Sequence, residues 1–224
     1  VRYNTGLHAS QNGQTLSNQL ELLGALWPVP LTEISVLVHS MGGLVTRSAV
    51  HLAQQNKRQW VKKLKNIVFL GTPHHGAPLE KAGNWVDVLL GVTPFSAPFK
   101  KLAELRSSGI TDLRFGYVLD SDWQGQDRFK TKTKQEQDRH EHLPLPDGVG
   151  CFTVAATLAA KRSLLADRLI GDGLVPLNSA LGVHRDPTRS LAFAKSSQRI
   201  IYRTNHVALL GSAEVSEQLL TWLT

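Results

Sequence analysis

The sequence predicts an α/β fold, with a mostly parallel sheet covered by helices on both faces. The chain has 224 residues, of which 42% are hydrophobic and 19% are charged, a composition typical of one globular domain. Short apolar runs alternate with segments of helical periodicity, as expected for parallel strands joined by helices. Polar loops follow the apolar runs, and parallel sheets carry their functional residues at such strand ends.

The first helix and the first strand are predicted before residue 40. The helix carries apolar residues at helical spacing, namely Leu16, Leu20, Leu23 and Trp27. Pro28 and Pro30 follow and end this helix. Residues 34–38 are short and nearly all apolar, which indicates a parallel strand covered on both faces.

The remaining elements follow the same alternation. After a turn at 39–43, a helical stripe is formed by Leu44, Ala49 and Leu52. Further strands are predicted at 67–70, 151–156 and 200–202, and Cys151 is expected to fill core space in its strand. The last helix has Val215, Leu219, Trp222 and Leu223 on one face.

Residues 77–147 interrupt the alternation and contain no comparable strand. We therefore expect one domain over 1–224 with an insertion above the sheet at 77–147. Its apolar residues have two interpretations, the buried face of an insertion helix or a lid that contacts substrate. The candidate substrate-binding residues are Trp85, Leu89, Leu90, Phe95 and Phe99.

The start of the chain resembles the end of a strand that begins earlier. Val1–Tyr3 runs directly into a turn with Asn4 and Gly6, so we expect an N-terminal truncation. No charged and apolar leader is visible. Localisation stays open, because a leader could be missing, and the single cysteine favours a reducing cytoplasm only weakly.

Charge and composition limit the classes of partner that the chain could bind. The formal net charge is +7, but basic residues are scattered and the densest stretch, 128–139, also contains acidic residues, so we expect no nucleic acid. Transient contact with an anionic lipid surface stays open. No apolar run approaches the roughly 18 residues of a membrane span. One cysteine excludes an internal disulfide framework and multi-thiolate metal sites.

We expect neither a metal nor a cofactor. His74 and His75 could be taken for metal ligands, but neighbouring positions on a strand-end loop point apart. No Cys, Asp or Glu in the adjoining motif completes a site.

Ser40 lies between a predicted strand and a predicted helix. A sharp turn there exposes the hydroxyl above the sheet and directs the following N–H at a developing oxyanion. Gly42 and Gly43 let the helix approach the strand closely. A serine becomes nucleophilic only when a base takes its proton and a third group orients that base.

The chain resembles the α/β-hydrolase superfamily, in its lipase and esterase branch, which includes proteins similar to GPI inositol-deacylases. The resemblance lies in four segments: 36–44 is similar to the nucleophile elbow, 71–76 to the loop after the next strand, 171–176 to the acid loop, and 205–206 to the histidine loop. It implies Ser40 as nucleophile, Asp172 as acid, His206 as base and the Met41 N–H in the oxyanion hole.

Each candidate also has an ordinary interpretation. Ser40 could cap the next helix, and Asp172 could be a turn residue, with Asp167 as its nearest rival for the acid. His206 could be structural. His39, beside the nucleophile, is expected to pack or hydrogen-bond near the elbow instead of acting as a base.

The chain departs from the family pattern in two ways. Val38 stands where glycine is usual, and its side chain is expected to crowd the elbow by about 1–3 kcal/mol unless neighbours adjust. The resemblance also implies a second oxyanion donor after an earlier strand, which the chain lacks before Val1. Loss of one donor typically lowers turnover about 100- to 1000-fold.

These patterns predict a serine hydrolase that cleaves carboxylic esters of small molecules or lipids through an acyl-enzyme. Two alternatives stay open. One is an acyltransferase with the same triad, and the other is a catalytically impaired fragment that binds lipid or a partner. The sequence leaves open the ester chain length, the head group and the oligomeric state.

Overall fold

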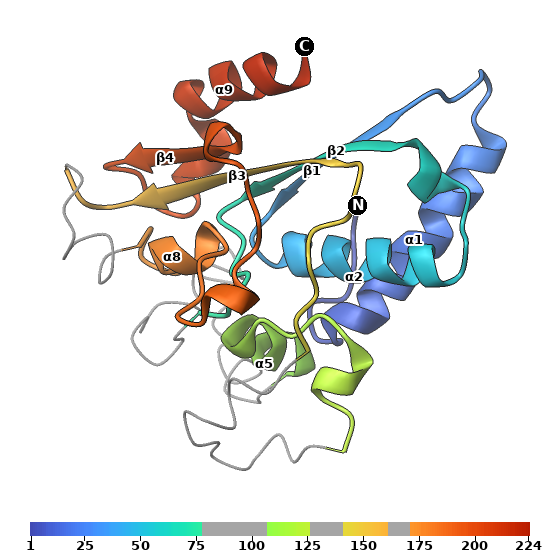
Figure 1. Cartoon of the computed structure of the whole chain (residues 1–224), viewed down its shortest axis with the longest axis horizontal. Coiled ribbons are helices and arrows are strands. Elements are labelled where there is room, and N and C mark those ends of the chain that lie inside the picture. Colours follow the sequence, from blue (N-terminus) through green and yellow to red (C-terminus); the bar gives the residue numbers. More distant parts are fainter. Residues whose placement is uncertain (78–106, 126–140, 161–170) are drawn as a thin grey trace, which may run out of the picture.

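A four-stranded parallel sheet organises the structure, which is a computed structural model that describes residues 1–77, 107–125, 141–160 and 171–224 (Figure 1). The strands are β1 (Ile34–His39), β2 (Leu64–Leu70), β3 (Gly150–Thr157) and β4 (Gln198–Tyr202), and they lie side by side in chain order. All three pairings are parallel. The sheet therefore brings the carboxyl ends of all four strands to one edge.

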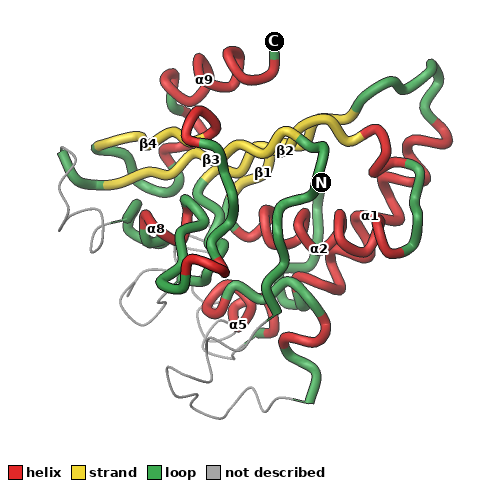
Figure 2. Tube along the Cα trace, in the orientation of Figure 1, coloured by secondary structure: helices red, strands yellow, loops and turns green. Residues whose placement is uncertain are grey.

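Helices cover both faces of this sheet, as Figure 2 shows. The helices are α1 (Ala9–Leu26), α2 (Met41–Gln55), α5 (Ser108–Phe115), α8 (Leu177–Ala180) and α9 (Ala213–Leu223). Short 3₁₀ helices are η1 (Trp60–Lys63), η3 (Asp120–Asp122), η4 (Pro187–Arg189), η5 (Lys195–Ser197) and η6 (Ala208–Gly211). The predicted fold class and the four predicted strands are confirmed.

Strand β2 shows how the two apolar layers arise. Ile67 and Phe69 belong to the cluster formed with α2, whereas Val68 and Leu70 belong to the cluster that includes Val215 of α9. Successive side chains of a strand point to opposite faces. A continuous apolar run therefore covers both faces, which explains why β2 lacks polar alternation.

Helix α1 packs differently from its predicted stripe. Leu16 and Leu20 do contact the core, but Leu23 and Trp27 are 50% and 47% exposed. The buried positions of α1 are mostly small or polar, namely Ala9, Ser10, Asn12, Gly13 and Ser17. A Cβ at Gly13 would lie 2.6 Å from Ser48 Oγ of α2, so close helix contact at small residues determines which face is buried.

Val1–Tyr3, expected to end a strand, lies outside the sheet. Tyr3 instead packs against the cluster that contains Met41 and Leu44, because its ring supplies apolar area beside the start of α2. None of the helices within the described ranges is both long and apolar enough to span a membrane.

The described part of the expected insertion holds α5 and η3. Helix α5 lies close to the start of α2, since a Cβ at Gly109 would be 2.7 Å from Met41 Cε. The candidate substrate-binding residues of this insertion lie outside the described residues; they are Trp85, Leu89, Leu90, Phe95 and Phe99.

Candidate active site

Ser40 occupies a strained turn between β1 and α2. Its backbone has φ 54° and ψ −126°, and its side chain makes no capping hydrogen bond to the helix. The Ser40 N–H donates to the Leu70 carbonyl at 2.9 Å, and the Ser40 carbonyl accepts from the Gly43 N–H at 3.0 Å. A left-handed backbone is costly for a residue with a Cβ and persists only where its surroundings impose it. These bonds impose it here, and the interpretation of Ser40 as a side-chain cap is wrong.

Two glycines open α2, but they meet different surroundings. A Cβ on Gly43 would lie 2.1 Å from Thr72 Oγ1, so α2 could not approach the β2 loop this closely with any other residue. A Cβ on Gly42 would lie 3.7 Å from Val38 Cβ, which is ordinary contact. The space between Val38 and Gly42 would therefore admit a methyl group, and the expected crowding of the elbow by Val38 is not seen at this contact.

We expect Gly43→Ala to lower the free energy of unfolding by about 1–3 kcal/mol, because overpacking a closed site forces its neighbours to move. Thr72 is fully buried and offers three atoms within 2.8 Å of the added carbon. The matched control is Gly42→Ala in the same turn, which should be neutral or stabilising because alanine favours helices by about 1 kcal/mol over glycine. Urea denaturation compares the two, and equal stabilities would contradict the packing argument.

A buried carboxylate and imidazole form the second half of the site. His206 Nδ1 lies 2.6 Å from Asp172 Oδ2, with the two residues 4% and 2% exposed. The other carboxylate oxygen, Oδ1, accepts from the N–H groups of Leu174 and Val175 at 2.9 and 2.8 Å. Since a carboxylate only accepts hydrogen bonds, Nδ1 carries the proton and Nε2 is left as a base.

Asp172 thus stabilises the turn at 172–175 through Oδ1 and orients His206 through Oδ2. Its rival, Asp167, lies outside the described residues. The backbone adds a further bond, because the His206 N–H donates to the Asp172 carbonyl at 3.1 Å. His206 is therefore held by two hydrogen bonds to Asp172, one from its ring and one from its main chain.

The elbow and the acid–base pair meet at the ends of β1 and β2. A Cβ at Gly71 would lie 3.1 Å from His206 Cε1, so the ring rests on the residue after Leu70, whose carbonyl holds the Ser40 N–H. His39, the neighbour of Ser40, lies 4.5 Å from the His206 ring between centroids. Ser40 Oγ makes no hydrogen bond to the described residues, and in unliganded sites such bonds are often long.

The site can support acyl transfer chemistry. Ser40 Oγ is a candidate nucleophile, and His206 Nε2 is a candidate base on a ring 4.5 Å from that of His39, the neighbour of Ser40. Met41 is the first residue of α2, so its N–H lacks an intrahelical partner and is a candidate oxyanion donor. The start of a helix also favours negative charge.

His74 and His75 diverge in the loop after β2. The His74 ring packs between Phe69 and Phe193, with centroids 4.8 and 5.5 Å away, and neither of its ring nitrogens has a hydrogen-bond partner among the described residues. The N–H of His75 donates to Ser179 Oγ at 3.1 Å. Within the described ranges, no three His, Cys, Asp or Glu residues are grouped as metal ligands.

Burial first, then repulsion by Arg47, lowers the pKa of His74 well below its ordinary value. The unfolded chain takes up this proton below about pH 6.5 while the folded one does not, so stability falls as the pH falls. Burial also lowers the pKa of His39 and His142. We expect His74→Phe to reduce the loss of unfolding free energy below pH 6.5 by up to about 1.4 kcal/mol per pH unit. Urea denaturation at several pH values between 7 and 5 measures this pH dependence. If the unfolding free energies of the parent and His74→Phe fell equally with pH, His74 would not be the source of the pH dependence.

Sequence reasoning missed two polar contacts near the site. Arg47 of α2 is buried, and its Nη2 donates to the Leu143 carbonyl at 2.6 Å; burial lowers its pKa to about 10. Asp112 of α5 is also buried and accepts from the His8 ring at 2.9 Å. Both contacts join residues about a hundred positions apart, and no local spacing in the sequence signals them.

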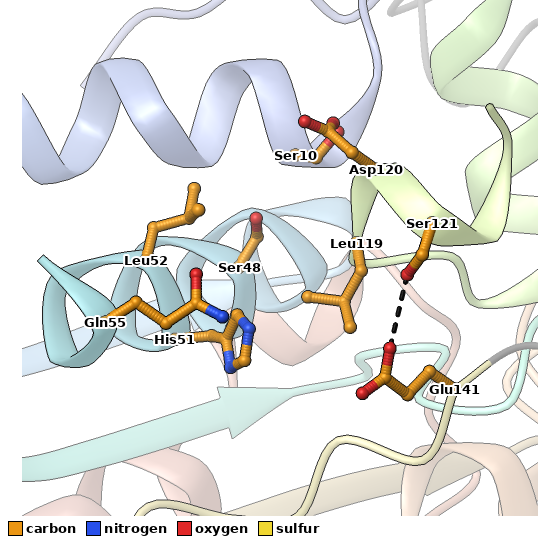
Figure 3. A pocket seen from close by; sticks show the side chains of 9 residues that line it. All are labelled: Ser10, Ser48, His51, Leu52, Gln55, Leu119, Asp120, Ser121 and Glu141. Atoms are coloured by element: carbon orange, nitrogen blue, oxygen red, sulfur yellow. Dashed lines mark hydrogen bonds between the residues drawn. The ribbon is translucent and has the colours of Figure 1, made fainter.

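A polar pocket of about 230 Å³ lies between α1, α2 and η3, well along α2 from Ser40 (Figure 3). It is lined by Ser10, Ser48, His51, Leu52, Gln55, Leu119, Asp120, Ser121 and Glu141. Ser121 Oγ donates to Glu141 Oε2 at 3.3 Å across it. It contains none of the candidate catalytic residues and is separate from the site at the strand ends.

The parallel sheet, with the left-handed serine and the buried Asp–His pair at its strand ends, has the arrangement of an α/β-hydrolase fold. Residues 3–140 match the model of the PGAP1-like alpha/beta domain, and the chain belongs to that family. The resemblance inferred from the motifs is thereby confirmed.

Solved structures show the same fold. The chain is similar to the crystal structure of the Bacillus licheniformis lipase BlEst2 in mature form, with a TM-score of 0.55 and 16% sequence identity over 97% of this chain and 75% of that one. The propeptide form gives a TM-score of 0.54 and 15% identity over 97% of this chain and 41% of that one. Comparison with curated proteins found no match.

Proposed function

We propose that the chain is a serine hydrolase that cleaves carboxylic esters with Ser40, His206 and Asp172. The observation that carries this proposal is the 2.6 Å hydrogen bond between the buried His206 and Asp172, beside a serine held at φ 54°. Strain of this kind clusters at functional sites, and the Ser40 hydroxyl makes no capping hydrogen bond to α2. Membership of the PGAP1-like family supports the hydrolase class.

In the proposed reaction, Ser40 Oγ attacks the ester carbonyl as His206 Nε2 takes its proton. Asp172 stabilises the imidazolium that forms, and the Met41 N–H stabilises the oxyanion. The tetrahedral intermediate collapses, and His206 returns the proton to the leaving alcohol, which leaves an ester bond between the acyl group and Ser40. Water, deprotonated by His206, then attacks that bond, and Ser40 recovers its proton as the acid departs.

The test of this mechanism is covalent labelling with a fluorophosphonate, which reacts only with an activated serine. We expect one label per chain, located by peptide mass spectrometry at Ser40. Ser48→Ala is the matched control, since Ser48 lies on α2 with its hydroxyl buried, and it should label as the parent does. Absence of labelling in the parent protein would overturn the proposal and favour a binding role.

Lipid esters are the proposed substrate class, because the fold is that of a lipase. The five apolar insertion residues named above, Trp85 among them, are proposed to contact the acyl chain, and the +7 charge favours approach to anionic lipid surfaces.

We expect the hydrolysis rate of a long-chain p-nitrophenyl ester to rise sharply above its aggregation concentration, because a cover over the site would open at an interface. Equal efficiency on monomeric short-chain esters, with no rise, would contradict the lid. Product analysis with competing alcohols separates hydrolysis from acyl transfer to an acceptor.

A further inference from the structure

His39 joins the strand end that carries Ser40 to the loop that carries His206. It is the last residue of β1 and is partly buried. Its Nε2 lies 3.0 Å from the His206 carbonyl oxygen, and the two imidazole rings lie 4.5 Å apart at an interplanar angle of 41°. The mechanism proposed above gives His39 no role.

This contact fixes the tautomer of His39. A carbonyl oxygen only accepts, so Nε2 carries the proton and donates it. Burial and the neighbouring His206 lower the pKa of His39, which favours a neutral ring. The main chain of His206 thus makes two hydrogen bonds. Its carbonyl accepts from His39, and its N–H donates to the Asp172 carbonyl at 3.1 Å.

We propose that His39 is a positioning residue that holds His206 in register with Ser40. The inference rests on the proposed function, since it assigns a role to a contact within that same site. His39 touches the main chain of the base and not the reacting atoms. Because His39 and Ser40 are consecutive, one strand end carries both the nucleophile and the hydrogen bond that locates its base.

The energetic reason is the steep distance dependence of proton transfer. His206 Nε2 must reach Ser40 Oγ to about 2.6–3.2 Å, and a displacement of about 1 Å can lower the rate about 100-fold. The loop of His206 follows β4, whereas Ser40 follows β1 at the far side of the sheet. Of the described side chains, His39 alone donates a hydrogen bond to the main chain of His206.

The experiment compares His39→Gln with His39→Leu and His39→Asn. The glutamine amide nitrogen is placed to replace Nε2, whereas asparagine is too short and leucine has no donor. We expect kcat of the Leu and Asn variants to fall about 10- to 100-fold while KM stays within about twofold, and His39→Gln to keep kcat within about threefold. Equal loss in all three variants, or no loss in any, would overturn the proposal.

A second readout does not depend on ester turnover. The proton shared by His206 Nδ1 and Asp172 gives a low-field ¹H NMR resonance when it is protected. We expect this resonance to be sharp in the parent and His39→Gln, and broadened in the Asn and Leu variants. The same pattern without any ester hydrolysis would reject the proposed function and retain the positioning role, whereas equally sharp resonances throughout would reject the positioning role whatever the activity.

Discussion

Ser40→Ala is expected to lower kcat for p-nitrophenyl ester hydrolysis by about 10⁴-fold or more, the largest effect among the substitutions considered. The substitution removes the oxygen that forms the acyl-enzyme in the proposed mechanism, and it leaves the backbone bonds of the elbow, to Leu70 and Gly43, in place. The protein should therefore stay folded and still bind ester. Steady-state kinetics with active-site titration provides the measurement.

The same reasoning predicts strong non-additivity. The proposed mechanism makes Ser40 and His206 act as one unit, so His206→Ala alone and the double variant should each be about as slow as Ser40→Ala alone. Ser48→Ala on the same helix serves as control and should keep the parental rate. Hydrolysis by Ser40→Ala within tenfold of the parent would mean that another nucleophile performs the reaction.

Asp172→Asn is expected to lower kcat by about 10⁴-fold, the second largest effect. An amide nitrogen facing Nδ1 favours the tautomer with the proton on Nε2, so the ring can no longer take the Ser40 proton. The amide oxygen can still accept from the Leu174 and Val175 N–H groups, which preserves the turn. Thermal unfolding should therefore change little while kcat falls.

The chain offers a matched control for this substitution. Asp186 Oδ1 accepts from the Thr188 N–H at 3.0 Å, two residues on, as Asp172 Oδ1 accepts from Leu174. Asp186 is exposed and is the N-cap of η4, outside the candidate site. Asp186→Asn should leave kcat within about twofold of the parent. A similar loss in both variants would point to a general effect of charge and not to the orientation of His206.

The strands could be predicted because each contains a short apolar run. The expected cover on both faces is wrong for β1, where Leu37 lies 53% exposed. Helix α1 shows the limit of that reasoning. Its leucines recur at helical spacing, yet Leu23 lies 50% exposed because Gly13 lets α2 approach on another face. Periodicity identifies a helix, but the choice between two faces depends on a partner far along the chain.

The candidate site divides in the same way. Ser40, Asp172 and His206 each follow a recognisable local pattern, and their order along the chain fits the order of the parallel strands. The contact between His39 and the His206 carbonyl joins positions 167 apart in sequence, and the partly buried pair of His8 and Asp112 joins positions 104 apart. Such pairs arise from tertiary packing alone, so no spacing rule could have found them.

Because Ser40 has a left-handed backbone, the residue that would make position 40 most stable differs from the residue that the proposed reaction needs. Glycine adopts φ 54° without strain, so a glycine at this position would stabilise the elbow while removing the proposed nucleophile. Under the proposed function, catalysis at position 40 therefore opposes a thermodynamic preference for glycine, which has no hydroxyl to react. A family member released from that selection would be expected to exchange the serine for glycine early, and to keep its shape as a binding protein.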